Sequence, residues 1–261
     1  MKGDWWMIPV GETSRKTKAP LVTWTLIALN TIIFFYFYLQ GAKVFTLSIY
    51  KFGLIPFLIL QGKKLYTLLT SMFMHGSLEH LLGNMLFLYV FGPAVENRLG
   101  RLRFISLYLL SGFFADFFHI FIEAVFQEPL VLYGPFGHTV IDPLKIPSVG
   151  ASGAISGVLG AYLVLMPNAF LDVLTTIGLF PIVIRIPAVV FILFWFLYQL
   201  YMGVLSLALP YPFFSGVAFW AHVGGWVAGF IIAIIIGRKA RRTRRVRIDY
   251  KGRVWYEIPV E

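Results

Sequence analysis

Cysteine is absent from the 261 residues of this chain, and charged residues are scarce, at 13%. Without thiols, disulfides, thiolate metal sites and a cysteine nucleophile are all excluded. Soluble domains carry about 25% charged residues, so this composition argues against an ordinary soluble domain. Apolar residues instead make up 59% of the chain, and they gather in long runs.

Six apolar runs approach the ~20 residues that a helix needs to cross ~30 Å of hydrocarbon. The third run contains Asp116 and His119, and the fourth is short and rich in glycine, so both require a protein interior around their polar atoms. The first run is expected to be a retained helix, because no small-residue cleavage site follows it. The sequence therefore predicts an all-α membrane protein with six transmembrane helices, at residues 21–39, 77–95, 104–122, 149–166, 188–209 and 217–236.

The net charge of +10 is unevenly distributed. Most basic residues precede the first run, lie between the second and third, or follow the sixth. By the positive-inside rule both termini are cytoplasmic, and we expect a multi-pass protein of a prokaryotic cell membrane. The basic tail is expected to hold anionic lipid rather than nucleic acid or a protein partner. The opposite side of the membrane holds only Lys43, Lys51, Lys63, Lys64 and Lys145.

The predicted organisation is a cytoplasmic segment at 1–20, one transmembrane domain at 21–237 and a basic cytoplasmic tail at 238–261. Two longer outer segments interrupt the domain. Residues 40–76 are expected to form an interfacial loop with some helix, whereas the closely spaced prolines and glycines of 123–148 exclude a long helix. For the apolar stretch 170–187, a position at the interface and an extension of the fifth helix are both open.

Four polar side chains from three predicted helices share one depth. With a cytoplasmic N-terminus, the second, fourth and sixth helices all run inward, so their early residues lie near the outer surface. At 1.5 Å per residue, we expect His80, Asn84, Ser152 and His222 about 5–10 Å below the outer edge. Independent packing residues need not share a level.

Ser152 lies in the sequence Gly150-Ala151-Ser152-Gly153. A serine becomes a nucleophile when a base removes its proton, and histidine is the usual base near neutral pH. The start of a helix also leaves backbone N–H groups unpaired, and these can stabilise an oxyanion. Taken alone, the motif is better explained by a small-residue packing face on which Ser152 bonds back to its own helix.

His222 is followed by Gly225 and Gly229, a spacing that lets membrane helices approach closely. If this face packs on Gly153 and Gly157, His222 meets Ser152. Ser156 lies one turn deeper and is the less accessible partner. The alternative is a buried histidine bonded to a carbonyl group.

His80 and Asn84 lie four residues apart on one helix face. Two side-chain donors that point to one place suit a developing negative charge, although hydrogen bonds between helices would explain them equally well.

Other polar residues have simpler interpretations. Asp116, His119 and Glu123 share one face, where metal ligation is an alternative to a polar packing face. Glu96 and Arg98 are interpreted as an ion pair or helix-end anchor at the turn into the third helix. His75 and His138 receive no role.

Four motifs in family order resemble the rhomboid intramembrane proteases over roughly residues 20–237: His75-Gly76-Ser77-Leu78-Glu79-His80-Leu81-Leu82-Gly83-Asn84-Met85, Glu96-Asn97-Arg98-Leu99-Gly100, Gly150-Ala151-Ser152-Gly153 and Ala221-His222-Val223-Gly224-Gly225. The resemblance implies a six-helix bundle and a serine endopeptidase without cofactor, metal or nucleic-acid partner.

By the same resemblance Ser152 is the nucleophile and His222 the general base and later acid, without a third acidic residue. His80, Asn84 and the Ser152 backbone N–H would form the oxyanion hole. The resemblance also implies a wet cavity open to the outer face and transmembrane substrates, often with a small residue before the cut. Glu96, Arg98, Gly150, Gly153 and Gly225 would have supporting roles.

Two positions depart from the family pattern. Many relatives carry an aromatic ring four residues after the nucleophile, where this chain has Ser156. The Trp-Arg pair of the first outer loop is replaced by Lys63-Lys64-Leu65-Tyr66.

Other membrane proteases fit less well. A zinc protease of the site-two type needs His-Glu-x-x-His, which is absent, and an aspartyl type needs two intramembrane aspartates, whereas only Asp116 lies in a predicted helix. A transporter is expected to show repeat symmetry, and we find none. A catalytically inactive rhomboid-like protein that binds membrane helices is the main alternative, although such proteins commonly lack the serine or the histidine.

Overall fold

The computed structural model describes residues 7–14, 18–134, 137–177, 180–208, 217–241, 245–250 and 254–259. Part of the predicted N-terminal segment, with Lys2, Arg15 and Lys16, lies outside the described residues, and so do the side chains of the basic tail. The predictions made for these residues therefore stay predictions.

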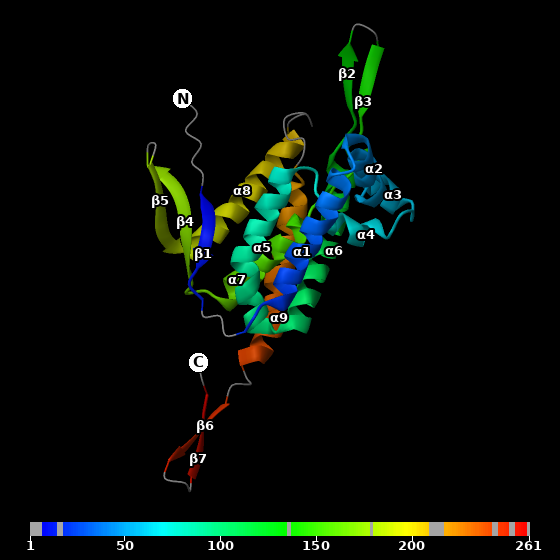
Figure 1. The fold of residues 1–261 in the computed structure, drawn as a ribbon. Helices are drawn as coiled ribbons and strands as arrows, with labels where there is room; N and C mark the ends of the chain where they lie inside the picture. Colours follow the sequence, from blue (N-terminus) through cyan, green and yellow to red (C-terminus); the bar gives the residue numbers. More distant parts are fainter. Residues whose placement is uncertain are drawn as a thin grey trace.

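A bundle of long apolar helices forms the body of the protein (Figure 1). In the described part of the chain, five helices are long and apolar enough to cross a membrane. The fourth predicted span forms a shorter helix of 14 residues, α7 (Ser152–Leu165), which covers ~21 Å. The predicted all-helical membrane bundle is confirmed, with five such helices plus α7. The five are α1 (Leu21–Tyr38), α5 (Leu78–Leu99), α6 (Arg101–Phe126), α8 (Ala188–Ala208) and α9 (Phe219–Arg241).

The short helix α7 is the centre of the bundle. It packs against α5, α6, α8 and α9, and almost all of its side chains are buried. The backbones of α7 and α9 touch, because a Cβ atom on Gly229 would collide with the carbonyl group of Gly157. Helices in a membrane approach this closely where both carry small residues. The glycine spacing had predicted this contact from the sequence.

The segment between α1 and α5 folds as short helices at one end of the bundle (Figure 1). This agrees with the prediction of a loop with some helix for residues 40–76. The isolated bridge between Leu54 and Ser148 ties it to the second outer segment. The pieces are α2 (Ala42–Phe52), α3 (Pro56–Leu60), α4 (Thr67–Thr70) and η1 (Ser71–Phe73).

A β-hairpin projects beyond the bundle at the same end (Figure 1). It consists of β2 (Leu130–Gly134) and β3 (Gly137–Ile141) and is followed by the 3₁₀ turn η2 (Pro143–Lys145). The prediction that 123–148 contains no long helix is confirmed, except that α6 continues to Phe126.

An antiparallel sheet beside the bundle was not predicted. Its strand order is β1 (Ile8–Glu12), β4 (Phe170–Ile177) and β5 (Phe180–Pro187). Residues 170–187 are therefore a hairpin and do not extend the fifth helix. The period-two alternation that marks a half-buried strand is present at Leu171 and Val173, which are buried, while Asp172 between them is not.

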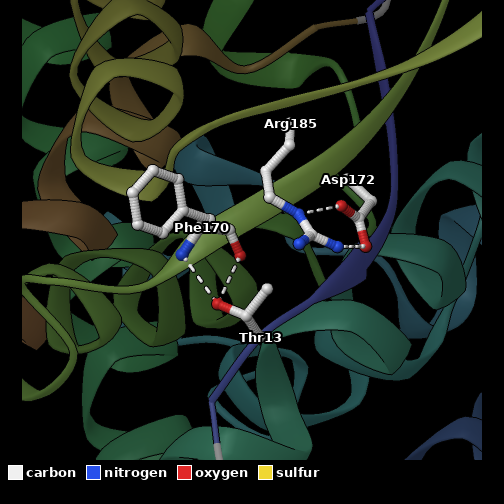
Figure 2. A network of polar contacts seen from close by, with 4 residues as sticks. All are labelled: Thr13, Phe170, Asp172 and Arg185. Atoms are coloured by element: carbon white, nitrogen blue, oxygen red, sulfur yellow. Dashed lines mark hydrogen bonds and ion pairs between the residues drawn. The ribbon is translucent and has the colours of Figure 1, made fainter.

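Polar contacts join the strands of this sheet at its surface (Figure 2). Arg185 holds the carboxylate of Asp172 with two hydrogen bonds of 2.8 and 3.3 Å. The Phe170 N–H donates to the Thr13 hydroxyl, which in turn donates to the Phe170 carbonyl group. From the same N-terminal segment, Glu12 accepts a hydrogen bond of 2.9 Å from the Tyr162 hydroxyl near the end of α7.

The start of α1 is held by the end of α5. Glu96 is only 3% exposed and accepts hydrogen bonds from the backbone N–H groups of Val22 and Thr23 and from the Thr23 hydroxyl, at 2.8–3.0 Å. α1 has no side-chain cap of its own, so Glu96 supplies acceptors for its orphan donors. The prediction that Glu96 fixes the turn into the third helix is wrong, because its partners belong to α1.

Beyond α9, a third hairpin consists of β6 (Arg245–Tyr250) and β7 (Val254–Pro259) (Figure 1). The sequence had been interpreted there only as a basic tail.

Candidate active site

Ser152 is the first residue of α7, so its backbone N–H has no acceptor within the helix. The preceding Gly150 has φ = +134° and faces the His80 ring, because a Cβ atom there would lie 2.7 Å from His80 Nε2 and 3.4 Å from Ser152 Oγ. A side chain at position 150 would therefore fill the space that Ser152 and His80 share. The hydroxyl that bonds back to its own helix is that of Ser156, which donates to the Ser152 carbonyl group at 2.6 Å.

His80 and Asn84 come from the first turns of α5. The Ser77 hydroxyl caps this helix by accepting a hydrogen bond from the His80 N–H at 3.2 Å. Asn84 is buried, and its Nδ2 group has no hydrogen-bond partner in the described part of the chain. An unpaired buried donor is costly, so a polar group of a ligand would be favourable here.

His222 reaches the same region from α9. A Cβ atom on Gly153, next to Ser152, would lie 2.6 Å from the Ala115 Cβ of α6 and 3.8 Å from the carbonyl oxygen of Ala221, next to His222. One turn further along α9, a Cβ on Gly225 would collide with the Gly153 carbonyl group. The backbone contact that the glycine spacing predicted therefore involves the residue next to the serine.

Two residues of α8 contact His222, and neither was predicted from the sequence. The Gln199 side-chain oxygen lies 2.7 Å from His222 Nδ1. The Trp195 ring, one turn earlier, lies 5.8 Å from the His222 ring between centroids, at an interplanar angle of 34°. A glutamine inside an apolar run was the available signal, because polar side chains within membrane spans need a reason.

One cavity of about 900 Å³ connects these groups. Ser152, His222, His80, Asn84 and Gln199 all line it. A hydroxyl at a helix start, an imidazole and side-chain donors around one cavity are the parts that acyl transfer to a serine requires.

Comparison with known proteins identifies the family of the chain. A family model described as the rhomboid domain matches residues 62–239. The chain belongs to the rhomboid family. With its apolar helices, the rhomboid is a multi-pass membrane protein.

Relatives of this rhomboid include proteins named as proteases. It is 29% identical over 233 residues to rhomboid protease GluP of Bacillus subtilis, covering 87% of this chain and 38% of that protein. It is 31% identical to the putative rhomboid protease YdcA of the same organism, over 55% of this chain and 61% of the relative. Rhomboid protein 1, mitochondrial, of Saccharomyces cerevisiae is 28% identical over 73% of this chain and 47% of that protein. The rhomboid thus spans less than two thirds of the length of each.

His75, for which no role was predicted, is buried beside His80. It is 1% exposed, and its ring lies edge-on to the His80 ring with centroids 5.1 Å apart. Neither ring nitrogen has a hydrogen-bond partner among the residues described. Burial, with a smaller contribution from His80, lowers the pKa of His75 to about 3, so it packs as a neutral ring.

Asp116, His119 and Glu123 of α6 also line the cavity of the rhomboid. His119 Nδ1 lies 3.7 Å from the Glu123 carboxylate. In the described ranges, no group of three or more His, Asp or Glu side chains is arranged to hold a metal ion. Their common face borders the cavity itself, and is not only a surface for helix packing. Arg98 lies exposed in the last turn of α5.

Proposed function

We propose that this rhomboid is an intramembrane serine endopeptidase in which Ser152 and His222 cut transmembrane proteins. The observation that carries the proposal is the backbone contact between Gly153 and Gly225, which joins the helix that begins at Ser152 to the helix of His222 beside one cavity. The protease names of several relatives support the same activity.

In the proposed reaction, His222 takes the proton of the Ser152 hydroxyl as its oxygen attacks the carbonyl carbon of the substrate. The tetrahedral intermediate collapses when His222 gives this proton to the leaving amine, and an acyl-enzyme remains. Water then attacks the ester, again with His222 as base, and releases the carboxyl product and Ser152. No cofactor is needed.

The negative oxygen of the intermediate requires donors that are in place beforehand. We assign this role to His80, the Asn84 side-chain amide and the Ser152 backbone N–H. The unpaired Asn84 Nδ2 group and the free N–H at the start of α7 support this assignment. In this assignment Gly150 leaves the space in which the oxyanion forms.

The distribution of basic residues supports an orientation with both termini in the cytoplasm. The cavity then lies toward the outer leaflet of a cell membrane, and the substrates are transmembrane proteins whose helices unwind near that face. Arg98, together with Glu96, has a supporting structural role at the opposite end of α5.

The test uses the purified full chain in detergent with a panel of transmembrane substrates. Cleavage by the wild type that is lost in both Ser152→Ala and His222→Ala is the expected result. Labelling of the wild type by a fluorophosphonate, but not of Ser152→Ala, would identify the nucleophile independently of substrate choice. Cleavage that persists in either variant would contradict the dyad. No cleavage and no labelling of folded wild type would favour the inactive helix-binding alternative.

A further inference from the structure

His222 is on α9, and two side chains of α8, Gln199 and Trp195, contact its ring. The Gln199 oxygen lies 2.7 Å from Nδ1, and the Gln199 side chain is only 6% exposed. An amide oxygen can only accept a hydrogen bond. In this arrangement Nδ1 carries the hydrogen, and the lone pair of the neutral ring is on Nε2.

This tautomer matters for the proposed dyad. A histidine that serves as general base must present a bare nitrogen to the serine hydroxyl, and the hydrogen bond made by its other nitrogen decides which nitrogen that is. In serine proteases of other folds a carboxylate accepts the Nδ1 hydrogen and has this role. The sequence had suggested no third residue.

We infer that Gln199 is a positioning residue of the catalytic centre, which accepts a hydrogen bond from His222 Nδ1 and directs Nε2 toward Ser152. This inference rests on the proposed endopeptidase function. The neutral amide sets the tautomer and the ring orientation without adding a charge to the cavity.

The surroundings of the ring support this role. The aromatic position four residues after the nucleophile is occupied by Ser156, whose hydroxyl is already bonded to the Ser152 carbonyl group. The Trp195 ring lies beside His222 instead, from the same face of α8 as Gln199 and four residues earlier. α8 thus supplies both an aromatic neighbour and a hydrogen-bond acceptor, and the two together define where the imidazole lies.

A simple interhelical hydrogen bond is the competing explanation, in which Gln199 only joins α8 to α9. The two explanations differ in the variants they tolerate. Gln199→Met keeps the length and volume of the side chain but removes the acceptor. Gln199→Glu keeps the acceptor and removes the donor, although it places a charge in a buried position.

The experiment measures kcat and KM of the full chain in detergent with one cleaved transmembrane substrate. We expect Gln199→Met to lower kcat at least about 10-fold with KM within about twofold, because the tautomer and orientation are lost and substrate contacts are not. Gln199→Glu should recover most of the wild-type kcat. The matched control is Gln127→Met, because Gln127 also binds α8, through the Ser206 carbonyl group at 3.2 Å, but does not touch His222; its kcat should stay near the wild-type value.

Each outcome either supports or overturns the inference. A wild-type kcat in Gln199→Met, or folded Gln199→Glu that is less active than Gln199→Met, would overturn it, and so would loss of the fold in both variants. If only Gln199→Met fails to fold, the kcat of Gln199→Glu decides. An inactive wild type, or an active Ser152→Ala variant, would instead refute the endopeptidase itself.

Discussion

The contact between α7 and α9 makes Gly225→Ala a sensitive test of the proposed active site. A Cβ atom on Gly225 would collide with the Gly153 carbonyl oxygen and lie 2.9 Å from its carbonyl carbon. Carbon atoms in contact are about 3.5–4.0 Å apart, so the two helices would have to separate by ~1 Å. Gly153 directly follows Ser152, and Gly225 lies one turn after His222. Separation of the two helices would therefore also move Ser152 and His222 apart.

A misplacement of ~1 Å can lower a catalytic rate about 100-fold, and we expect this loss in kcat/KM for Gly225→Ala. Overpacking of this kind costs ~1–3 kcal/mol of stability, so the variant should still fold at 25 °C. The assay compares cleavage rates and thermal unfolding of the purified variant and the wild type.

Gly11→Ala is the control, because it adds the same methyl group to a glycine outside the residues that line the cavity, where its Cβ atom would make an ordinary contact of 3.5 Å with Asp172. Its rate should stay within about twofold of the wild type. Wild-type kcat/KM in Gly225→Ala would refute the argument that this backbone contact sets the distance between Ser152 and His222.

Three further predictions concern stability and metal dependence. Glu96→Gln should lower the free energy of unfolding by about 2 kcal/mol, because a buried carboxylate that accepts several hydrogen bonds becomes a neutral amide. Thr23→Val should lower it by about half as much. Equal thermal midpoints for Glu96→Gln and the wild type would contradict this. The His75 pKa falls from 6.5 to about 3 on folding. The contribution of the neutral ring to stability is therefore fully present above pH 6.5 and is lost as the pH falls toward 3. At pH 5 the free energy of unfolding should be lower by about 2 kcal/mol. His75→Phe should flatten that dependence in thermal unfolding between pH 7.5 and 5. Excess chelator should leave cleavage unchanged, whereas loss of activity that added metal restores would indicate ligation by Asp116 and His119.

The membrane bundle and the α7–α9 contact could be predicted because both depend on local patterns. A long apolar run predicts a span, and glycines four residues apart predict a close helix pair. The pair Gly225 and Gly229 and the pair Gly153 and Gly157 illustrate this, since the predicted faces are the ones that touch.

Contacts between distant segments could not be predicted in the same way. Glu96 was assigned to the turn beside it in sequence, but its partners, Val22 and Thr23, lie on α1. The strand character of 170–187 was hidden because the alternation at Leu171, Asp172 and Val173 is short and most of the other residues in the stretch are apolar. The role of Gln199 was not predicted, although a glutamine within an apolar run is unusual, because nothing in the sequence indicated that α8 would face His222.

The pairing of β1 with β4 has a practical consequence for anyone who shortens this protein. Ile8–Glu12 form the edge strand that pairs with β4, and Glu12 accepts a hydrogen bond from Tyr162 near the end of the helix that begins with Ser152. Trimming them would expose the ladder groups of β4 to new neighbours and free one end of α7. Expression tags are therefore better fused ahead of these residues than substituted for them.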